Sequence, residues 1–270
     1  MSITTSVTHV SRARRIAAFV SALLIGPPCW SIAAASQPQT FASAADASEA
    51  LFQAVRSGDR HAVETVLGSG DGLASCGDEA RDTSEHQRFV EKYQQMHRLV
   101  REPDGTTVLY VGAENWPFPI PLVASRGRWH FDADSGRREI MCRQIGADEA
   151  TAIEVCRAVV EASKPGATPA NSTDPIIGYA ERLVGAGRAT SGTSGPAASG
   201  EKPFHGYRFI VLKSGGISVV AYPAEYRSSG VMTFIVGDDG AVYERDLGPD
   251  TARVARTLKT RPASGWRAVG

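Results

Sequence analysis

The sequence predicts an α+β fold in which helices precede an antiparallel sheet, and in which this order then occurs a second time. Apolar residues recur at helical spacing from Ser43 to about Leu99. From Thr106 the pattern changes to short β-prone runs that are separated by turn residues. A second helical pattern begins near Ala147 and leads into further strand-like runs. This order is not that of a doubly wound parallel sheet.

Two short helices are expected at the start of the first lobe. Ser43 is a suitable N-cap, Asp46 lies in the first turn, and Gly58 ends the helix. Asp59 then caps a second helix, which Gly68 stops. So tight a link predicts two antiparallel helices.

A third helix is expected over residues 84–99, with a partly buried apolar stripe. His86 and His97 lie 11 residues apart, close to three turns, so both could face one side of this helix. A metal site would need a third ligand nearby. We therefore interpret His86 as a surface residue and His97 as a neighbour of the core stripe.

The first sheet is expected to contain strands at 107–111, 121–124 and 128–132, with a hairpin turn at Arg126-Gly127. The run Asp132-Ala-Asp134-Ser-Gly136 looks like part of a calcium loop but lacks the other ligand positions. We interpret it as a hairpin turn between Phe131 and Ile140.

The second lobe is expected to begin with a helix from about Ala147 that Pro165-Gly166 stops. A Ser-, Gly- and Pro-rich insertion follows at about 163–203 and should be flexible, apart from one short helix at 176–184. The expected later elements are strands at 206–212, 217–222, 231–236 and 242–243 and a last helix after Pro249. These signals divide the chain into a signal peptide (1–35), a first lobe (40–145) and a second lobe (146–270).

The N-terminus has the features of a secretory signal peptide. Arg12, Arg14 and Arg15 form a positive region, residues 16–25 an apolar run, and Ala35-Ser36 a small-residue cleavage site. The apolar run is too short to cross a bilayer. We expect a periplasmic or extracellular protein with no stable membrane span after cleavage.

Composition and cysteine usage narrow the function further. The 29 basic and 29 acidic residues balance, and removal of the three leader arginines leaves 26 against 29, a net charge of −3. Neither the balance nor the distribution indicates nucleic-acid binding. Three cysteines remain after cleavage: Cys156 is expected to be buried, whereas whether Cys76 and Cys142 form a disulfide stays open.

Ordered sequence pieces along the chain resemble a bacterial family of exported proteins catalogued as domain of unknown function 2950. The pieces that carry the resemblance include Trp116-Pro-Phe-Pro-Ile-Pro-Leu122, Trp129-x-Phe-Asp132, Phe204-His-Gly-Tyr207, Ala221-Tyr-Pro-Ala-Glu-Tyr226 and Gly230-Val-Met-Thr-Phe-Ile-Val236. The chain departs from the family pattern between Lys164 and Pro203. The resemblance implies export but no activity. By weaker analogy, the first lobe is similar to the cone-shaped domains related to nuclear transport factor 2, and the second to the head of a type IV pilin.

Five aromatic residues are the candidates for a recognition surface: Trp116, Phe118, Trp129, Tyr222 and Tyr226. Aromatic side chains interleaved with proline can present flat faces to peptides or sugars. The alternative, which we favour for Trp116 and Phe118, is that both plug the edge of the sheet while their prolines block further strand pairing.

Two functional hypotheses follow, and the sequence favours a protein that is not an enzyme while leaving the question open. No catalytic, cofactor-binding or metal-ligating residue is identified: Gly-x-Ser-x-Gly is absent, and no nucleophile can be placed beside His205. The first hypothesis is an interaction or assembly module of the cell envelope, with a protein or glycan partner. The alternative is a small-molecule or glycan-binding cone, with or without hydrolytic activity. An enclosed cavity that contains Trp116 or Trp129 and at least two ionisable groups would favour the alternative.

Overall fold

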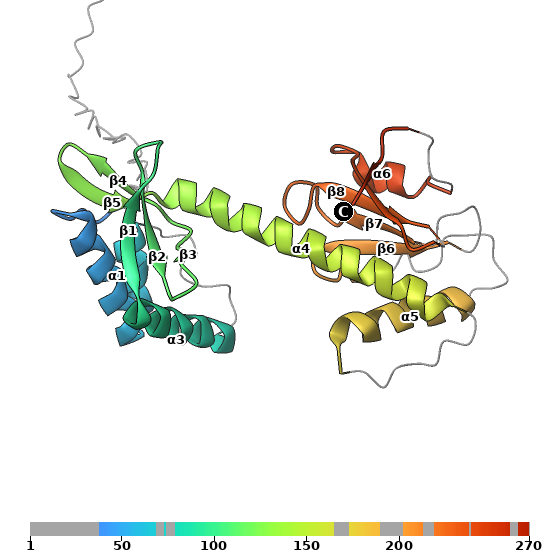
Figure 1. The fold of residues 1–270 in the computed structure, drawn as a ribbon, viewed down its shortest axis with the longest axis horizontal. Coiled ribbons are helices and arrows are strands. Elements are labelled where there is room, and N and C mark those ends of the chain that lie inside the picture. The colour runs from blue at the N-terminus through green and yellow to red at the C-terminus, as the bar shows by residue number, and fades with distance from the viewer. Residues whose placement is uncertain are drawn as a thin grey trace, which may run out of the picture. The chain divides into compact units, whose positions relative to one another are not determined.

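The computed structural model describes residues 38–68, 73, 79–164, 173–189, 202–212, 219–237, 239–259 and 264–269 (Figure 1). The expected signal peptide, the segment 190–200 and Cys76 lie outside these residues. Helices and two antiparallel sheets make up the described chain, so the predicted α+β class is confirmed.

The first lobe contains three helices and one antiparallel sheet. The helices are α1 (Ala44–Ser57), α2 (Arg60–Leu67) and α3 (Glu79–Gln95). The strands are β1 (His97–Arg101), β2 (Thr107–Val111), β3 (Trp116–Pro117), β4 (Leu122–Ser125) and β5 (Arg128–Phe131). Their order is β1-β2-β4-β5, and β3 pairs with β2.

Local capping explains where α1 and α2 begin and end. The Ser43 hydroxyl accepts a hydrogen bond from the Asp46 N–H, and the Asp59 carboxylate accepts one from the Ala62 N–H. Gly58 and Gly68 end the two helices in the left-handed conformation that glycine adopts without strain. The helices and the sheet enclose one apolar core that includes Leu51, Leu109, Val111, Leu122 and Phe131.

The predicted helix at 84–99 is confirmed as far as Gln95 and is wrong only at its C-terminal end, residues 96–99. Helix α3 ends at Gln95, and β1 follows in register with β2, so that Leu99 pairs with Leu109. Pairing with β2 satisfies the backbone groups of this segment, which local helical periodicity cannot reveal. His97 therefore does not share a helix with His86; its ring stacks on Tyr93 at 3.9 Å between centroids.

The hairpin turn predicted at 132–136 is also wrong, because these residues begin the long helix α4 (Ala133–Ser163). Asp132 is its N-cap and accepts a hydrogen bond from the Ser135 N–H at 3.0 Å. The helix thus starts well before Ala147, where apolar periodicity placed it. Turn-like small and polar residues here form a first helical turn, with Gly136 buried against Ile120.

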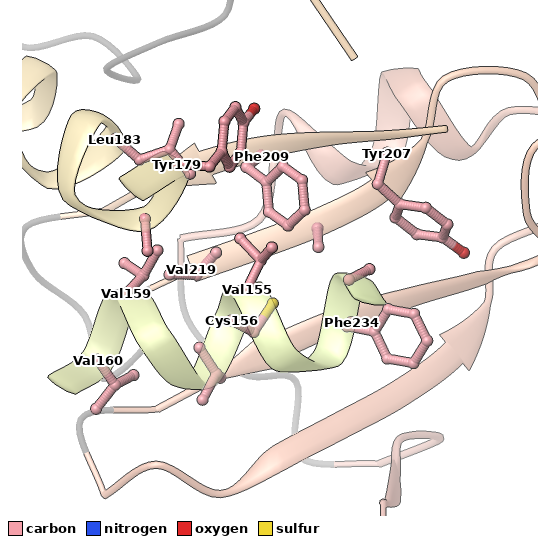
Figure 2. Packing of buried hydrophobic residues seen from close by; sticks show 14 of the residues in the cluster. Val155, Cys156, Val159, Val160, Tyr179, Leu183, Tyr207, Phe209, Val219 and Phe234 are labelled. Carbon is pink, nitrogen blue, oxygen red and sulfur yellow. The ribbon is translucent and has the colours of Figure 1, made fainter. Parts of the chain in front are cut away.

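The second lobe is a five-stranded antiparallel sheet with helices on both faces. Its order is β10 (Arg267–Ala268), β9 (Val242–Asp246), β8 (Met232–Val236), β7 (Val219–Pro223) and β6 (Tyr207–Val211). Side chains of α4 and α5 (Pro175–Ala189) pack on one face, together with Val219 and Phe234 (Figure 2). The short helix α6 (Thr251–Ala255) belongs to the cluster on the other face, which includes Val220 and Tyr222. The alternation along β7 therefore buries this strand on both sides.

Helix α5 confirms the short helix expected at 176–184 and extends it. Tyr179, Ala180 and Leu183 are buried in the core that α4 and the sheet share. Residues 176–184 therefore belong to the core of the second lobe, in a helix longer than the one expected. Among the residues that the structure describes, no helix is long and apolar enough to cross a bilayer.

Candidate functional site

A cavity of about 900 Å³ lies in the first lobe and is partly open to solvent. Helices α1 and α2 supply one apolar wall, and the residues that follow β2 supply another. The lining consists of Leu51, Val55, Val63, Leu67, Leu73, Asp82, Glu85, His86, Arg88, Phe89, Lys92, Val111, Trp116, Phe118, Pro119, Ile120 and Ile140. Most of these side chains are aliphatic or aromatic, so the cavity is an apolar chamber with a polar rim.

The polar rim comes from one face of α3. Asp82, Glu85, His86, Phe89 and Lys92 follow the spacing that places side chains on one side of a helix. His86, which we interpreted as a surface residue, is half-buried and lines the cavity.

Three charged residues of the lining form ion pairs. Arg88 pairs with Glu85 at 3.4 Å. The Lys92 Nζ lies 2.5 Å from the Glu114 Oε1, and this hydrogen bond lowers the pKa of Glu114.

Hydrogen bonds connect the turn before Trp116 to the end of α3 and to β1. The Gly112 N–H donates to the carbonyl oxygens of Lys92 at 3.1 Å and Met96 at 2.9 Å. The Arg98 Nε donates to the Asn115 Oδ1 at 2.8 Å. Gly112 has a φ of 76°, and a Cβ there would meet the Glu114 carboxylate at 2.5 Å, so glycine fits the position. These contacts fix the start of the proline-rich wall.

Arg143 of α4 holds the same wall from the other end. Its Nη1 donates to the carbonyl oxygen of Pro117 at 2.8 Å, and its Nε donates to Glu139 at 2.7 Å. The guanidinium carbon lies 5.3 Å from the centroid of the Trp116 ring, in a cation–π contact. The Trp116 side chain is therefore positioned although it remains 40% exposed.

The structure brings two of the five predicted recognition residues together. Trp116 and Phe118 meet edge to face, with 6.4 Å between ring centroids, and both line the cavity. Trp129 does not belong to the lining; its backbone pairs with Phe41 through hydrogen bonds of 2.8 and 2.9 Å.

The two tyrosines belong to the second lobe, and one of them cannot contact a partner. Tyr222 is buried in the core beside α6, so its place in the predicted surface is wrong. Tyr226 donates a hydrogen bond from its hydroxyl to Asp246 at 3.1 Å. Tyr222 and Tyr226 therefore do not join Trp116 and Phe118 in one site.

Comparison with known families identifies the chain. The family model described as "Protein of unknown function (DUF2950)" matches residues 38–203 and 213–269. The chain belongs to this family. The resemblance carried by the Trp116–Leu122 block is thereby confirmed, and the matched range includes the segment 164–203 where we expected a departure. No curated protein and no solved structure matches significantly.

The described part of this DUF2950 protein offers binding groups but no catalytic constellation around the cavity. Its described lining contains no serine, threonine or cysteine that could act as a nucleophile. Burial raises the pKa of Cys156 to about 12, and burial raises the pKa of Tyr207 even more strongly, but both lie in the core of the second lobe. The residues that the structure describes include no cluster of three His, Cys, Asp or Glu side chains fit to hold a metal ion.

Sequence reasoning missed the cavity because its lining is spread from Leu51 to Ile140 of this DUF2950 protein. One feature of the sequence does indicate a site. Phe89 lies among charged residues on one face of α3, and a helix face that only contacts water needs no aromatic residue there.

Proposed function

We propose that this protein binds a small, largely apolar molecule in the cavity of its first lobe. The observation that carries the proposal is the convergence of Trp116 with ionisable side chains of α3 on one apolar chamber. Cavities of this size, with apolar walls and a few polar groups, are typical of small-molecule sites. The cavity supports the small-molecule binding hypothesis over the assembly-module hypothesis. The recognition surface expected for an assembly module included Tyr222, which is buried in the core.

The lining favours an apolar ligand over a sugar. A sugar ring needs several hydrogen-bonding partners and a free aromatic face. Here the walls from α1 and α2 are aliphatic, and the Arg143 guanidinium lies over the Trp116 ring. Binding without chemistry also fits the absence of a nucleophile from the described lining.

We further propose that binding takes place outside the cytoplasm. The arginines, the short apolar run and Ala35-Ser36 support export and removal of residues 1–35. Mass spectrometry of the protein from native periplasm or culture medium should find a chain that begins at Ser36. A chain that keeps its first 35 residues would contradict this.

Two neighbouring substitutions on α4 test the binding site. Ile140 lines the cavity and is 37% exposed, whereas Met141 is 49% exposed and lies outside the lining. Ile140→Asp puts a carboxylate at the cavity, which costs about 1–3 kcal/mol of binding when the ligand is apolar. Met141→Asp adds the same charge to the same helix.

The measurement is titration with the neutral dye N-phenylnaphthylamine, followed by its fluorescence. We expect Ile140→Asp to weaken dye binding by about tenfold or more and Met141→Asp to leave it unchanged. Failure of the unmodified protein to bind the dye, or equal effects of the two variants, would refute the proposed site.

A further inference from the structure

The geometry points to a single-chain amphiphile with an anionic head group as the ligand of this cavity, with the head at Lys92. This inference rests on the proposed function and names the class of molecule that the same site takes.

The apolar walls suit an alkyl chain. The apolar lining includes residues of α1 and α2 and of the proline-rich block, so a chain would meet side chains that need no hydrogen bonds. These residues are Leu51, Val55, Val63, Leu67, Phe118 and Ile120. At ~30 Å³ per heavy atom, 900 Å³ corresponds to about 30 heavy atoms, which leaves room for a chain of a dozen or more carbons and its head.

Lys92 is less exposed to water than Arg88 and Glu85, the other two rim residues that form ion pairs. Its side chain is 26% exposed, compared with 60% for Arg88 and 55% for Glu85. Charge interactions strengthen as solvent is excluded. The apolar stem of Lys92 also lies close to Gly112, where a Cβ would come within 3.2 Å of the lysine Cγ.

An anionic head can take the place of Glu114 at Lys92. The Glu114 side chain is 64% exposed and lies outside the lining, so it can return to water when a ligand carboxylate or phosphate approaches. One ion pair is then exchanged for another, and no charge is left buried without a partner. A cationic head at this position would instead face the lysine ammonium group.

His86 supplies a second polar group on the same face of α3. Its ring is half-buried, lines the cavity and makes no hydrogen bond to the part of the chain that the structure describes. Phe89 lies between His86 and Lys92 along this face. The two polar side chains therefore flank an aromatic ring against which the first carbons of a chain can lie.

Four ligands with one twelve-carbon chain test the charge of the head: dodecanoate, dodecyl phosphate, dodecanol and dodecylamine. Each competes with N-phenylnaphthylamine at a concentration below its solubility limit and below any concentration at which it forms micelles. We expect at least one anion to bind about tenfold more tightly than the alcohol and the amine. The better anion then distinguishes a fatty acid from a phosphorylated lipid. Equal affinity of all four, or tightest binding of the amine, would overturn the inference.

Two variants test the position of the head. Lys92→Met keeps the apolar stem and should weaken binding of the preferred anion about tenfold while leaving dodecanol unchanged. Glu114→Gln removes the carboxylate that competes for Lys92 and should increase the affinity for the anion. Equal weakening of anion and alcohol by Lys92→Met would place the head elsewhere. Dye binding without binding of any dodecyl ligand would refute this inference and leave the proposed function standing.

Discussion

Two glycines of α4 allow the packing between this helix and the cavity wall to be measured. Gly136 is buried, and a Cβ there would lie 2.6 Å from the Cγ1 and 3.0 Å from the Cγ2 of Ile120. Gly146 is exposed, and a Cβ there would meet nothing within 4 Å. The same substitution by alanine therefore tests helix propensity alone at one position, and propensity against a clash at the other.

The expected magnitudes have opposite signs. Alanine in a helix interior is more favourable than glycine by about 1 kcal/mol, so Gly146→Ala should stabilise the protein by about that amount. Gly136→Ala gains the same propensity but overpacks a buried site, which costs about 1–3 kcal/mol. Its net effect is therefore about 0–2 kcal/mol of lost stability, and the two variants differ by about 1–3 kcal/mol.

Urea unfolding followed by tryptophan fluorescence measures this difference. The midpoint for Gly146→Ala should rise and that for Gly136→Ala should stay or fall. Because Ile120 also lines the cavity, Gly136→Ala should additionally weaken dye binding. Equal stabilisation by the two substitutions would refute the close approach of Gly136 to Ile120.

Three further predictions concern α4 and the second lobe. Glu149 accepts hydrogen bonds of 2.9 Å from two backbone N–H groups at the start of β8, so Glu149→Ala should cost about 3 kcal/mol in urea unfolding, against less than about 0.5 kcal/mol for exposed Glu154→Ala. Burial raises the pKa of Tyr207 above its ordinary value of 10.0, so the stability that this residue contributes is complete below that pH and is lost above it. The stability difference between wild type and Tyr207→Phe should accordingly shrink between about pH 8 and about pH 11, by at most about 1.4 kcal/mol per pH unit, and a constant difference would contradict this. A thiol reagent should label exposed Cys142 in the native protein and buried Cys156 only after unfolding, as judged by peptide mass spectrometry.

The elements that local sequence determines were predicted well. The strand at 107–111 has the predicted bounds, the strand at 206–212 is one residue shorter at each end, and the strand at 231–236 begins one residue later. Alternating β-branched and aromatic residues between turn signals carry this information within the segment itself. The same holds for the capped helices α1 and α2, whose N-caps Ser43 and Asp59 make the expected hydrogen bonds.

The errors occur where contacts outside the segment contribute to its structure. Residues 97–101 form a strand because β2 pairs with them. Helix α4 begins after its N-cap Asp132, and Gly136 in its first turns is buried against Ile120. The cavity could not be predicted for the same reason, since its lining comes from four helices, α1 to α4, and from the block after β2. Only the aromatic members of that block were identified in advance.

In the proline-rich block, Trp116 and Phe118 can both close the edge of the sheet and contact a ligand. Its β3 is two residues long and pairs with β2 beyond the point where β4 joins that strand. The Phe118 N–H donates to the Leu109 carbonyl at 2.7 Å, whereas Pro117, Pro119 and Pro121 have no N–H to offer a further strand. A continuous strand would spread its side chains over both faces of the sheet. A short, proline-interrupted one can occupy the sheet edge and still line the cavity with Trp116, Phe118 and Ile120.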